Sequence, residues 1–359
     1  MKRVCIVSTA DLSRMTMLSI YTKYFIENHI EYDIICGKKD GKNEDPNAHA
    51  IYEFDARPTD KSSKAAKLLH FWSMRKMVRK IWDDNTYDFV VVWNQVTSFL
   101  LADILKKRFK GKYCINIRDY QLDDKPIIKQ RLAYATKHAA FNTISSEAYK
   151  QFLPKGEYLT IHSLNTTMLS GIEKHDGKRL PGQPIRILNI GQIRWLDNIY
   201  PLIDELGNDN RYEMYFIGVG SEKLKEYIEE HNIKNVTLHG RFQPDETPDF
   251  LKNADVIFNL YGVGRLHVDT ALSIKLYYAV YLGVPILTYK GTYMNEVATR
   301  LGIGYSVTKD ELSGMKDDFY SWYQDFDEIL ARQKCDEYIS EALNSHDTLY
   351  RKMDSYLNN

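Results

Sequence analysis

The fold of this chain is decided by the stretch Asn259-Leu-Tyr-Gly262-Val-Gly264, which continues after six intervening residues as Ala271-Leu-Ser273-Ile-Lys275-Leu-Tyr-Tyr278-Ala-Val-Tyr-Leu-Gly283-Val-Pro285-Ile-Leu287. The apolar residues before Gly262 predict a strand, the glycines a tight loop, and the later run a helix that leads into another strand. Such a repeat is typical of parallel α/β folds. Because backbone amides at a helix start are unpaired and carry the positive end of the dipole, we expect Gly262, Ser273 and Lys275 to surround an anion. A solvated helix lysine is the usual alternative for Lys275.

The same alternation of short β-rich runs and helical stretches extends in both directions. The predicted strands of the first half are Val4–Ser8, Tyr32–Cys36, Phe89–Trp93, Tyr113–Ile117 and Ala140–Thr143, with helices such as Met15–Asn28, Lys64–Trp82 and Ser98–Arg108 between them. Those of the second half are Ile185–Ile190, Tyr212–Ile217, Val236–His239, Val256–Leu260 and Pro285–Thr288. The pattern predicts an α/β protein with two Rossmann-like, doubly wound domains that face a cleft. Ligands bind such sheets at the carboxyl ends of their strands.

A run of breakers, Gly177-Lys-Arg-Leu-Pro181-Gly-Gln-Pro184, separates the two series of strands. It predicts a boundary between domains. We therefore expect a first domain over residues 1–180 and a second over residues 185–335. The helical end, residues 336–359, is expected to pack back on the first domain.

The composition is that of a globular protein, with 359 residues of which 44% are hydrophobic and 27% charged, and this excludes a disordered or fibrous chain. Residues 1–179 carry 30 Lys and Arg against 21 Asp and Glu, whereas residues 185–359 carry 18 against 27. We therefore expect the two domains to meet different partners. With no secretory signal, no membrane-spanning run and four cysteines without metal-type spacing, we expect a cytoplasmic protein with reduced thiols. The absence of a recognition motif argues against nucleic acid as a partner.

The first strand of the second series ends at Gly191, and Arg194 follows three residues later. A glycine lets the backbone approach a ligand closely, and an arginine offers a planar fork of donors suited to phosphate. A tight turn with a solvated arginine explains the same residues. A plain strand-to-helix turn likewise explains Gly218-Val-Gly220, which lacks the third glycine of a dinucleotide fingerprint.

Together these segments resemble the donor domain of GT-B glycosyltransferases, above all glycosyltransferase family 4 and its relatives in bacterial surface-polysaccharide synthesis. The likeness rests on the run Lys275–Leu287, on Gly291-Thr-Tyr-Met-Asn-Glu296 and on Gly302-Ile-Gly304. Ahead of them stand, in the family's order, Gly191 to Arg194, Gly218-Val-Gly220, His239-Gly-Arg241-Phe242 and Ala254-Asp-Val256. The resemblance covers residues 185–310 and reaches Ile117-Arg-Asp-Tyr120 and Thr143–Pro154 in the first half.

This resemblance implies a nucleotide-sugar donor, favours a UDP-sugar, and implies no further cofactor and no bound metal. Arg194 and Lys275 would neutralise the diphosphate, assisted by amides near Ser273. The backbone around Arg241 would lie near the base, and Tyr278 stands where the family has a ribose-binding glutamate.

The chain also departs from the family. Thr270 and Tyr278 replace a pair of glutamates, and the usual lysine after the first donor-domain strand falls on Asp197, which leaves Arg194 as its substitute. Ser8-Thr-Ala-Asp11 stands where a glycine-rich loop is expected. Ribose recognition and the stereochemical outcome therefore stay open.

Arg118 and Asp119 follow the predicted strand Tyr113–Ile117 and should reach the edge of the cleft. A carboxylate there could orient or deprotonate an acceptor hydroxyl, which makes Asp119, beside Arg118, the candidate catalytic group. A structural Asp119 that caps a turn or pairs with Arg118 fits equally well.

The segment Arg57–Trp82 combines aromatic residues with eight basic ones and, up to Lys80, a single acid, Asp60. A basic helix with exposed aromatics lies well on anionic lipid headgroups. We therefore predict that the protein is peripheral on the inner face of the cell membrane. An ordinary amphipathic helix that covers a sheet is the alternative. The basic residues are Arg57, Lys61, Lys64, Lys67, Arg75, Lys76, Arg79 and Lys80, and the aromatic ones Phe71, Trp72 and Trp82.

These observations predict a hexosyltransferase that moves a sugar from a UDP-sugar to a lipid-linked or growing oligosaccharide in capsule or exopolysaccharide synthesis. One alternative is a non-catalytic GT-B subunit that binds or stabilises a partner transferase, which the missing glutamates favour. Another is a GT-B nucleotide-sugar epimerase. The sequence leaves the oligomeric state, including a homo-oligomer, open.

Overall fold

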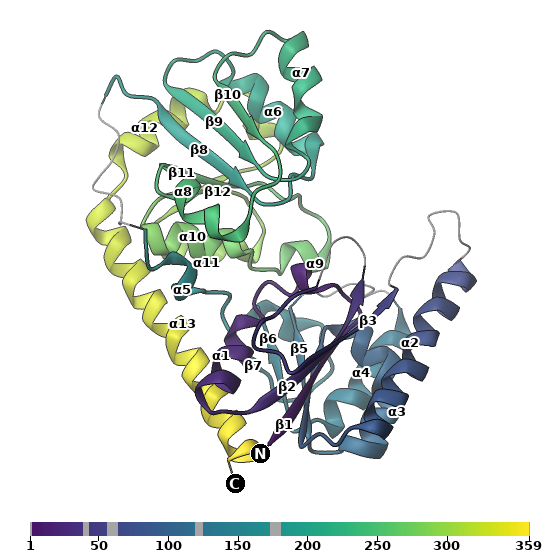
Figure 1. The fold of residues 1–359 in the computed structure, drawn as a ribbon. Coiled ribbons are helices and arrows are strands. Elements are labelled where there is room, and N and C mark those ends of the chain that lie inside the picture. The colour runs from purple at the N-terminus through teal and green to yellow at the C-terminus, as the bar shows by residue number, and fades with distance from the viewer. Residues whose placement is uncertain (1, 39–42, 56–63, 119–124, 173–180, 359) are drawn as a thin grey trace. The chain divides into compact units, whose positions relative to one another are not determined.

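The computed structural model describes residues 2–38, 43–55, 64–118, 125–172 and 181–358, with the backbone alone for 64–71. It contains two parallel sheets, a seven-stranded one in the order β3-β2-β1-β4-β5-β6-β7 and a six-stranded one in the order β10-β9-β8-β11-β12-β13 (Figure 1). Each sheet lies in its own compact unit: unit 1 comprises Met1–His162 with Asn344–Asn359, and unit 2 comprises Ser163–Leu343. The predicted α/β class with two doubly wound sheets is confirmed.

In unit 1, helices α2, α3 and α4 cover one face of the sheet, and α1 with the end of α13 covers the other (Figure 1). The strands are β1 (Arg3–Ser8), β2 (Glu31–Lys38), β3 (Ala50–Asp55), β4 (Phe89–Trp93), β5 (Tyr113–Ile117), β6 (Phe141–Ile144) and β7 (Leu159–Thr160). The helices are α1 (Ser19–Glu27), α2 (Lys64–Asp84), α3 (Gln95–Phe109) and α4 (Pro126–His138), with 3₁₀ turns η1 (Leu12–Arg14) and η2 (Glu147–Gln151). Strand β4, at the centre of this sheet, is apolar throughout, because both of its faces are covered.

Unit 2 has the same layered plan. Its strands are β8 (Ile185–Ile190), β9 (Tyr212–Ile217), β10 (Val236–His239), β11 (Val256–Asn259), β12 (Ile286–Tyr289) and β13 (Gly304–Val307). Its helices are α5 (Thr166–Leu169), α6 (Leu196–Leu206), α7 (Lys225–Glu230), α8 (Thr247–Leu251), α9 (Leu266–Asp269), α10 (Ile274–Leu282), α11 (Tyr293–Arg300), α12 (Lys316–Asp325) and α13 (Glu328–Leu357), with turns η3 (Ser221–Leu224), η4 (Pro244–Glu246) and η5 (Asp310–Leu312).

Strand β8 shows how the sequence builds two cores. Ile185 and Ile187 belong to the core beneath α6 and α12, whereas Leu188 and Ile190 belong to the core shared with α10, α11 and α13. Successive side chains of a strand point to opposite faces. The apolar run of β8 is therefore explained by helices on both sides of the sheet.

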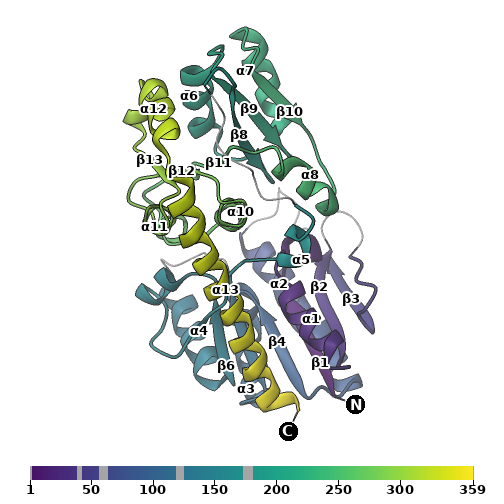
Figure 2. The same ribbon diagram turned by 90° about the vertical axis from the view of Figure 1, so that its left-hand side faces the viewer.

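Helix α13 is continuous from Glu328 to Leu357, but its last residues belong to unit 1 (Figure 2). There Leu349 and Met353 are fully buried, and Asp354 accepts a 2.6 Å hydrogen bond from the hydroxyl of Tyr24 on α1. The division between the units falls at His162 and Ser163, ahead of the breaker-rich run. Residues 177–180 of that run lie outside the described residues.

Two residues that the membrane prediction places against lipid are buried instead. Arg75 on α2 forms a bidentate ion pair with Asp103 on α3, and Arg131 on α4 binds the same carboxylate, so that one aspartate ties three helices together. These hydrogen bonds hold the pKa of Asp103 well below its usual range. Trp82 is also buried and donates to the Cys5 thiol. Arg75 and Trp82 are therefore structural. Arg57, Lys61 and the side chains of Lys64, Lys67 and Phe71 lie outside the described residues.

Candidate functional site

The sheet of unit 2 has its topological switch point between β8 and β11. The chain leaves β8 towards β9 and β10 on one side, and reaches β12 and β13 from β11 on the other. Loops that follow two such strands diverge and leave space between them at the carboxyl edge, which is where open α/β sheets bind ligands. The loops that follow β8 and β11 contain Gly191 and Gly262, both predicted site residues.

The loop after β8 is held by backbone contacts with the loop after β9. The amide of Ile193 donates to the carbonyl of Val219 at 2.9 Å. A side chain at Gly218 would place its Cβ 1.7 Å from the carbonyl oxygen of Gly191. Gly218 is therefore required for packing between the loops, which gives this motif a structural role. Gly191 itself has a φ of +105° and open space where a Cβ would lie.

Helix α10 begins at Ile274, within the run predicted to be helical. The Ser273 side chain caps it by accepting from the amide of Lys275 at 3.3 Å. The Lys275 ammonium, however, points inward: the residue is 2% exposed, and its Nζ donates to Oδ1 of Asn189 on β8. It also lies 5.0 Å from the ring centroid of Tyr261. Burial lowers the pKa of this ammonium, because desolvation disfavours its charged form.

The other predicted donor-side residues divide into exposed and buried ones. Arg194 and Arg241 are exposed, and Arg194 donates to the side-chain oxygen of Gln192. Tyr278 is packed in the core, and burial raises the pKa of its hydroxyl. Thr270, which occupies the other glutamate position, is buried as well. The backbone therefore presents Arg194 and Arg241 to solvent and turns Tyr278 into the interior.

Two residues that sequence reasoning missed lie at the same edge. Trp195, which directly precedes α6, has a left-handed φ of +62° and is 36% exposed. The Arg265 guanidinium, from the loop after β11, lies 5.4 Å from the centroid of the indole of Trp195. A bulky residue in this backbone region costs about 1–3 kcal/mol, and such strain gathers at functional sites. Their proximity depends on the pairing of β8 with β11, which no local motif shows.

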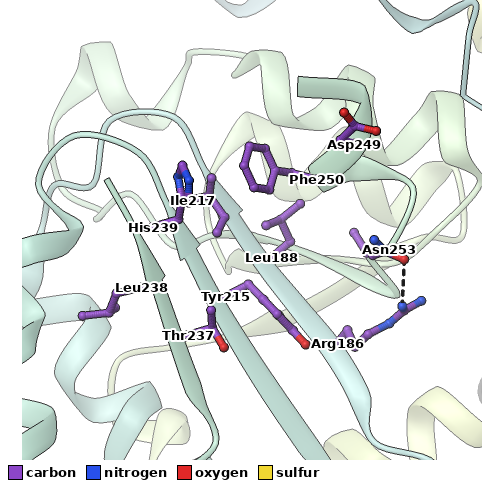
Figure 3. Close-up of a pocket in the computed structure, with 11 residues that line it drawn as sticks. Arg186, Leu188, Tyr215, Ile217, Thr237, Leu238, His239, Asp249, Phe250 and Asn253 are labelled. Atoms are coloured by element: carbon purple, nitrogen blue, oxygen red, sulfur yellow. Dashed lines mark hydrogen bonds between the residues drawn. The ribbon is translucent and has the colours of Figure 1, made fainter. Parts of the chain in front are cut away.

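A cavity of about 220 Å³ lies over β8, β9 and β10, beside α8 (Figure 3). Leu188, Tyr215 and Ile217 line it from the sheet, and Phe250 from α8. His239, the last residue of β10, also lines the cavity, and the centroid of its ring is 5.1 Å from that of Phe250. The Phe242 ring, next to Arg241, lies 5.4 Å from that of Phe250. The rings of His239, Phe242 and Phe250 thus form an aromatic cluster beside the loop that follows β10.

Of the two acceptor-side residues, the structure describes Arg118 alone; Asp119 lies outside the described residues. Arg118 is 9% exposed, and its carbonyl accepts hydrogen bonds from the Ser145 and Tyr149 hydroxyls at 2.8 and 2.9 Å. His346 of α13 is buried in the same unit with its Nε2 at 2.9 Å from the carbonyl of His162, and burial lowers its pKa. The two hydrogen bonds to the Arg118 carbonyl anchor the backbone at the end of β5.

The described residues also bear on metal sites and on membrane spans. No group of three or more His, Cys, Asp or Glu side chains there is arranged to hold a metal ion. In the same part of the chain, no helix has the length and apolar character needed to cross a membrane.

Comparison with known proteins gives a family match for the second unit. Residues 172–341 match the model of the family described as Glycosyl transferases group 1. No curated protein sequence matches the chain.

Solved structures match over nearly the whole chain. Sucrose-phosphate synthase from Thermosynechococcus elongatus has a TM-score of 0.73 at 10% identity, covering 99% of this chain and 100% of its own. An Escherichia coli structure described as trehalose-6-phosphate bound with UDP-2-fluoro glucose has a TM-score of 0.68 at 7% identity, covering 99% of both chains. WaaG, a glycosyltransferase involved in lipopolysaccharide biosynthesis, has a TM-score of 0.61 at 10% identity, covering 100% of both. At these identities the structures establish the shared fold.

Proposed function

We propose that this chain, a glycosyltransferase of the GT-B fold whose second unit carries the group 1 domain, transfers a hexosyl group from a UDP-sugar to a lipid-linked or growing oligosaccharide. The acceptor would belong to a bacterial surface polysaccharide such as a capsule or exopolysaccharide. One observation carries the donor side of this proposal. Among the described residues, Arg194, Arg241 and Arg265 have no carboxylate partner, although they lie in an acidic half of the chain and follow strands β8, β10 and β11 of one sheet.

The arrangement suits a departing diphosphate. When the bond to the sugar breaks, negative charge develops on the phosphate oxygen, and fixed donors that face this charge lower the barrier. Arg194 is such a donor, and the positive end of the α10 helix dipole favours negative charge at the same edge. The base would lie against the loop at Arg241 and Phe242, where His239 and Phe250 add aromatic surface. In this proposal no metal ion is needed, because side chains and the helix dipole supply the positive charge.

On the acceptor side, Asp119 remains the proposed group that orients or deprotonates the acceptor hydroxyl. The support is its position next to Arg118, whose carbonyl is held by two hydroxyls. We expect Asp119→Asn to lower transfer by on the order of 100-fold while donor affinity is kept. Equal turnover of the variant and the parent would remove Asp119 from the mechanism.

The proposed attachment to the inner face of the membrane now rests on a smaller set of residues. Trp72 is 44% exposed, and Lys76, Arg79 and Lys80 on the same helix are exposed. Lys76→Glu with Lys80→Glu should abolish flotation with anionic vesicles, since each basic side chain near an anionic surface contributes about 1 kcal/mol. The matched control is Lys223→Glu with Lys225→Glu in unit 2, which should float like the parent. Equal flotation of both double variants would leave α2 as a helix that only covers its sheet.

A non-catalytic GT-B subunit is the second candidate, favoured by Thr270 and Tyr278 in place of glutamates and by their burial. The first experiment is calorimetry of the parent with UDP, GDP and ADP and with their hexose conjugates. Transfer from the best donor to a lipid-linked oligosaccharide then decides between enzyme and subunit. Conversion of the donor without an acceptor would identify an epimerase instead. Failure to bind any nucleotide would refute the proposed function.

A further inference from the structure

Trp195 combines a left-handed backbone with an exposed indole, and both features need an explanation. The carbonyl of Trp195 accepts from the amide of Asn198 at 2.8 Å, so its left-handed conformation belongs to a defined turn before α6. Glycine adopts this conformation without strain. The stability of the turn therefore does not explain why an exposed tryptophan occupies this position.

Its contact with Arg265 connects the loops at the two sides of the switch point. Asn198 strengthens the connection, since its Nδ2 lies 3.4 Å from the carbonyl oxygen of Leu260 at the end of β11. The aromatic face attracts the guanidinium and restricts where it can point. Arg265 is thereby held at the edge that carries Arg194, the residue next to Trp195 in sequence.

We propose that Arg265, positioned by Trp195, binds the diphosphate of the nucleotide donor together with Arg194. The inference rests on the proposed function and assigns the second cation of its anion site. A diphosphate carries two separate anionic groups, and guanidinium forks can grip such oxygens in pairs. Trp195 is a positioning residue and Arg265 a binding residue.

The position of Lys275 is a reason to look for this second cation. Its ammonium is enclosed, donates to Asn189 and lies against Tyr261. A phosphate bound above the edge would therefore meet Arg194 and Arg265 at the surface before it met Lys275. In addition, Gly264 and Asp269 form their own contact, with the carboxylate 3.1 Å from the Gly264 amide. This contact fixes the loop from which Arg265 projects.

The test compares UDP with UMP by calorimetry at fixed ionic strength. Arg265→Ala should weaken UDP binding about 10- to 100-fold, the effect of losing a charge-assisted contact, and should change UMP binding by less than about threefold. The matched control is Arg300→Ala. Arg300 lies over the Tyr338 ring at 5.9 Å, at the end of α11, so that the variant loses the same charge and a similar ring contact elsewhere. UDP affinity in Arg265→Ala equal to that of the parent would overturn the proposal.

Trp195 is tested by Trp195→Gly and Trp195→Phe. The glycine variant should melt at or above the parent's temperature, because it relieves the left-handed strain, yet should bind UDP about 5- to 10-fold more weakly. The phenylalanine variant should recover most of that affinity. A lower melting temperature with unchanged UDP affinity would make Trp195 structural. If the parent binds neither UDP nor GDP nor ADP, the proposed function fails, whereas a parent that binds and an unaffected Arg265→Ala refute only this inference.

Discussion

At the amino end of the second sheet, Arg186 of β8 and Arg211 before β9 are both neutralised. Arg186 pairs with the buried carboxylate of Asp255 at 3.0 Å, and Arg211 binds Asp209 and Asp317 at 2.6 and 2.8 Å. At the carboxyl end, the arginines follow β8, β10 and β11 and are exposed. The described residues provide no carboxylate partner for any of these three, which are Arg194, Arg241 and Arg265.

The two ends teach how to separate structural from functional charge within one domain. The carboxylates near the carboxyl edge are used otherwise: those of Glu222, Glu246 and Asp269 accept from backbone amides. Positive charge that is left uncompensated in an acidic domain attracts an anionic ligand. The amino edge should therefore respond to mutation with altered stability, and the carboxyl edge with altered affinity.

The largest effect is expected at the carboxyl edge. Arg194→Ala combined with Arg265→Ala should weaken UDP binding by about 100- to 10,000-fold, because two charge-assisted contacts of about 1.5–3 kcal/mol each are lost. The melting temperature should stay within about 2 °C, since neither side chain is buried. Calorimetry and thermal unfolding measure the two quantities. Loss of stability instead of affinity would erase the difference between the edges.

At the amino edge we expect the reverse result. Asp255→Ala should lower the free energy of unfolding by about 2–3 kcal/mol, because the Arg186 guanidinium, 18% exposed, loses its buried partner. UDP affinity should remain within about twofold. Urea unfolding and calorimetry check both numbers. A large loss of affinity at unchanged stability would contradict the assignment of Arg186 as structural.

Lys275 is neither exposed like the arginines of the carboxyl edge nor paired with a carboxylate like those of the amino edge. The variant Lys275→Met tests whether its ammonium binds phosphate. We expect the unfolding free energy to rise by about 1 kcal/mol, because a desolvated ammonium is replaced by an apolar side chain of similar length. UDP affinity should fall less than fivefold. Since the folded pKa lies below 10.5, the parent's stability should gain as pH rises from neutral towards 10, and the variant should lack this gain. A loss of UDP affinity as large as that of Arg265→Ala would place the ammonium on the phosphate.

The smallest effect concerns the acid titration of the amino edge. A hydrogen bond from Arg211 lowers the pKa of Asp209, so its stabilising effect is complete above about pH 4 and is lost as pH falls through the lowered pKa. Asp209→Asn should remove this loss, at a cost of about 1 kcal/mol or less at neutral pH. Urea unfolding of both proteins between pH 2 and 7, about the range that spans this titration, would show the difference. If the free energy of unfolding changed with pH in the same way in both proteins, the Asp209–Arg211 pair would make no contribution to the pH dependence of stability.

The sheets could be predicted where their strands are short runs of mainly apolar residues. Phe89–Trp93, Ile185–Ile190 and Tyr212–Ile217 coincide with β4, β8 and β9. Strand β3 is not among the predicted strands, because Ala50–Asp55 mixes apolar with acidic residues and is partly exposed at the edge of the sheet. Strand β13 was missed because it is short and begins with Gly304.

The candidate site was predictable only in part, for a physical reason. Gly191, Arg194 and Ser273 follow from local motifs, because a strand end or a helix start is visible in sequence. Whether a charge is free is decided by partners from distant elements. Arg75 finds Asp103 on another helix, and Arg265 finds Trp195 across paired strands. The inward direction of Lys275 likewise depends on Asn189, a residue of another strand.

The path of α13 imposes an order of events during synthesis. Residues 344–358 leave the ribosome after all of unit 2, yet they complete unit 1, where Tyr356 packs against Phe89 and Phe141. When synthesis has reached residue 343, unit 2 can therefore be folded while the sheet of unit 1 still exposes Phe89 and Phe141 to water. The portion made first is therefore the last to close, and its sheet keeps an uncovered apolar face until the final helix has been synthesised.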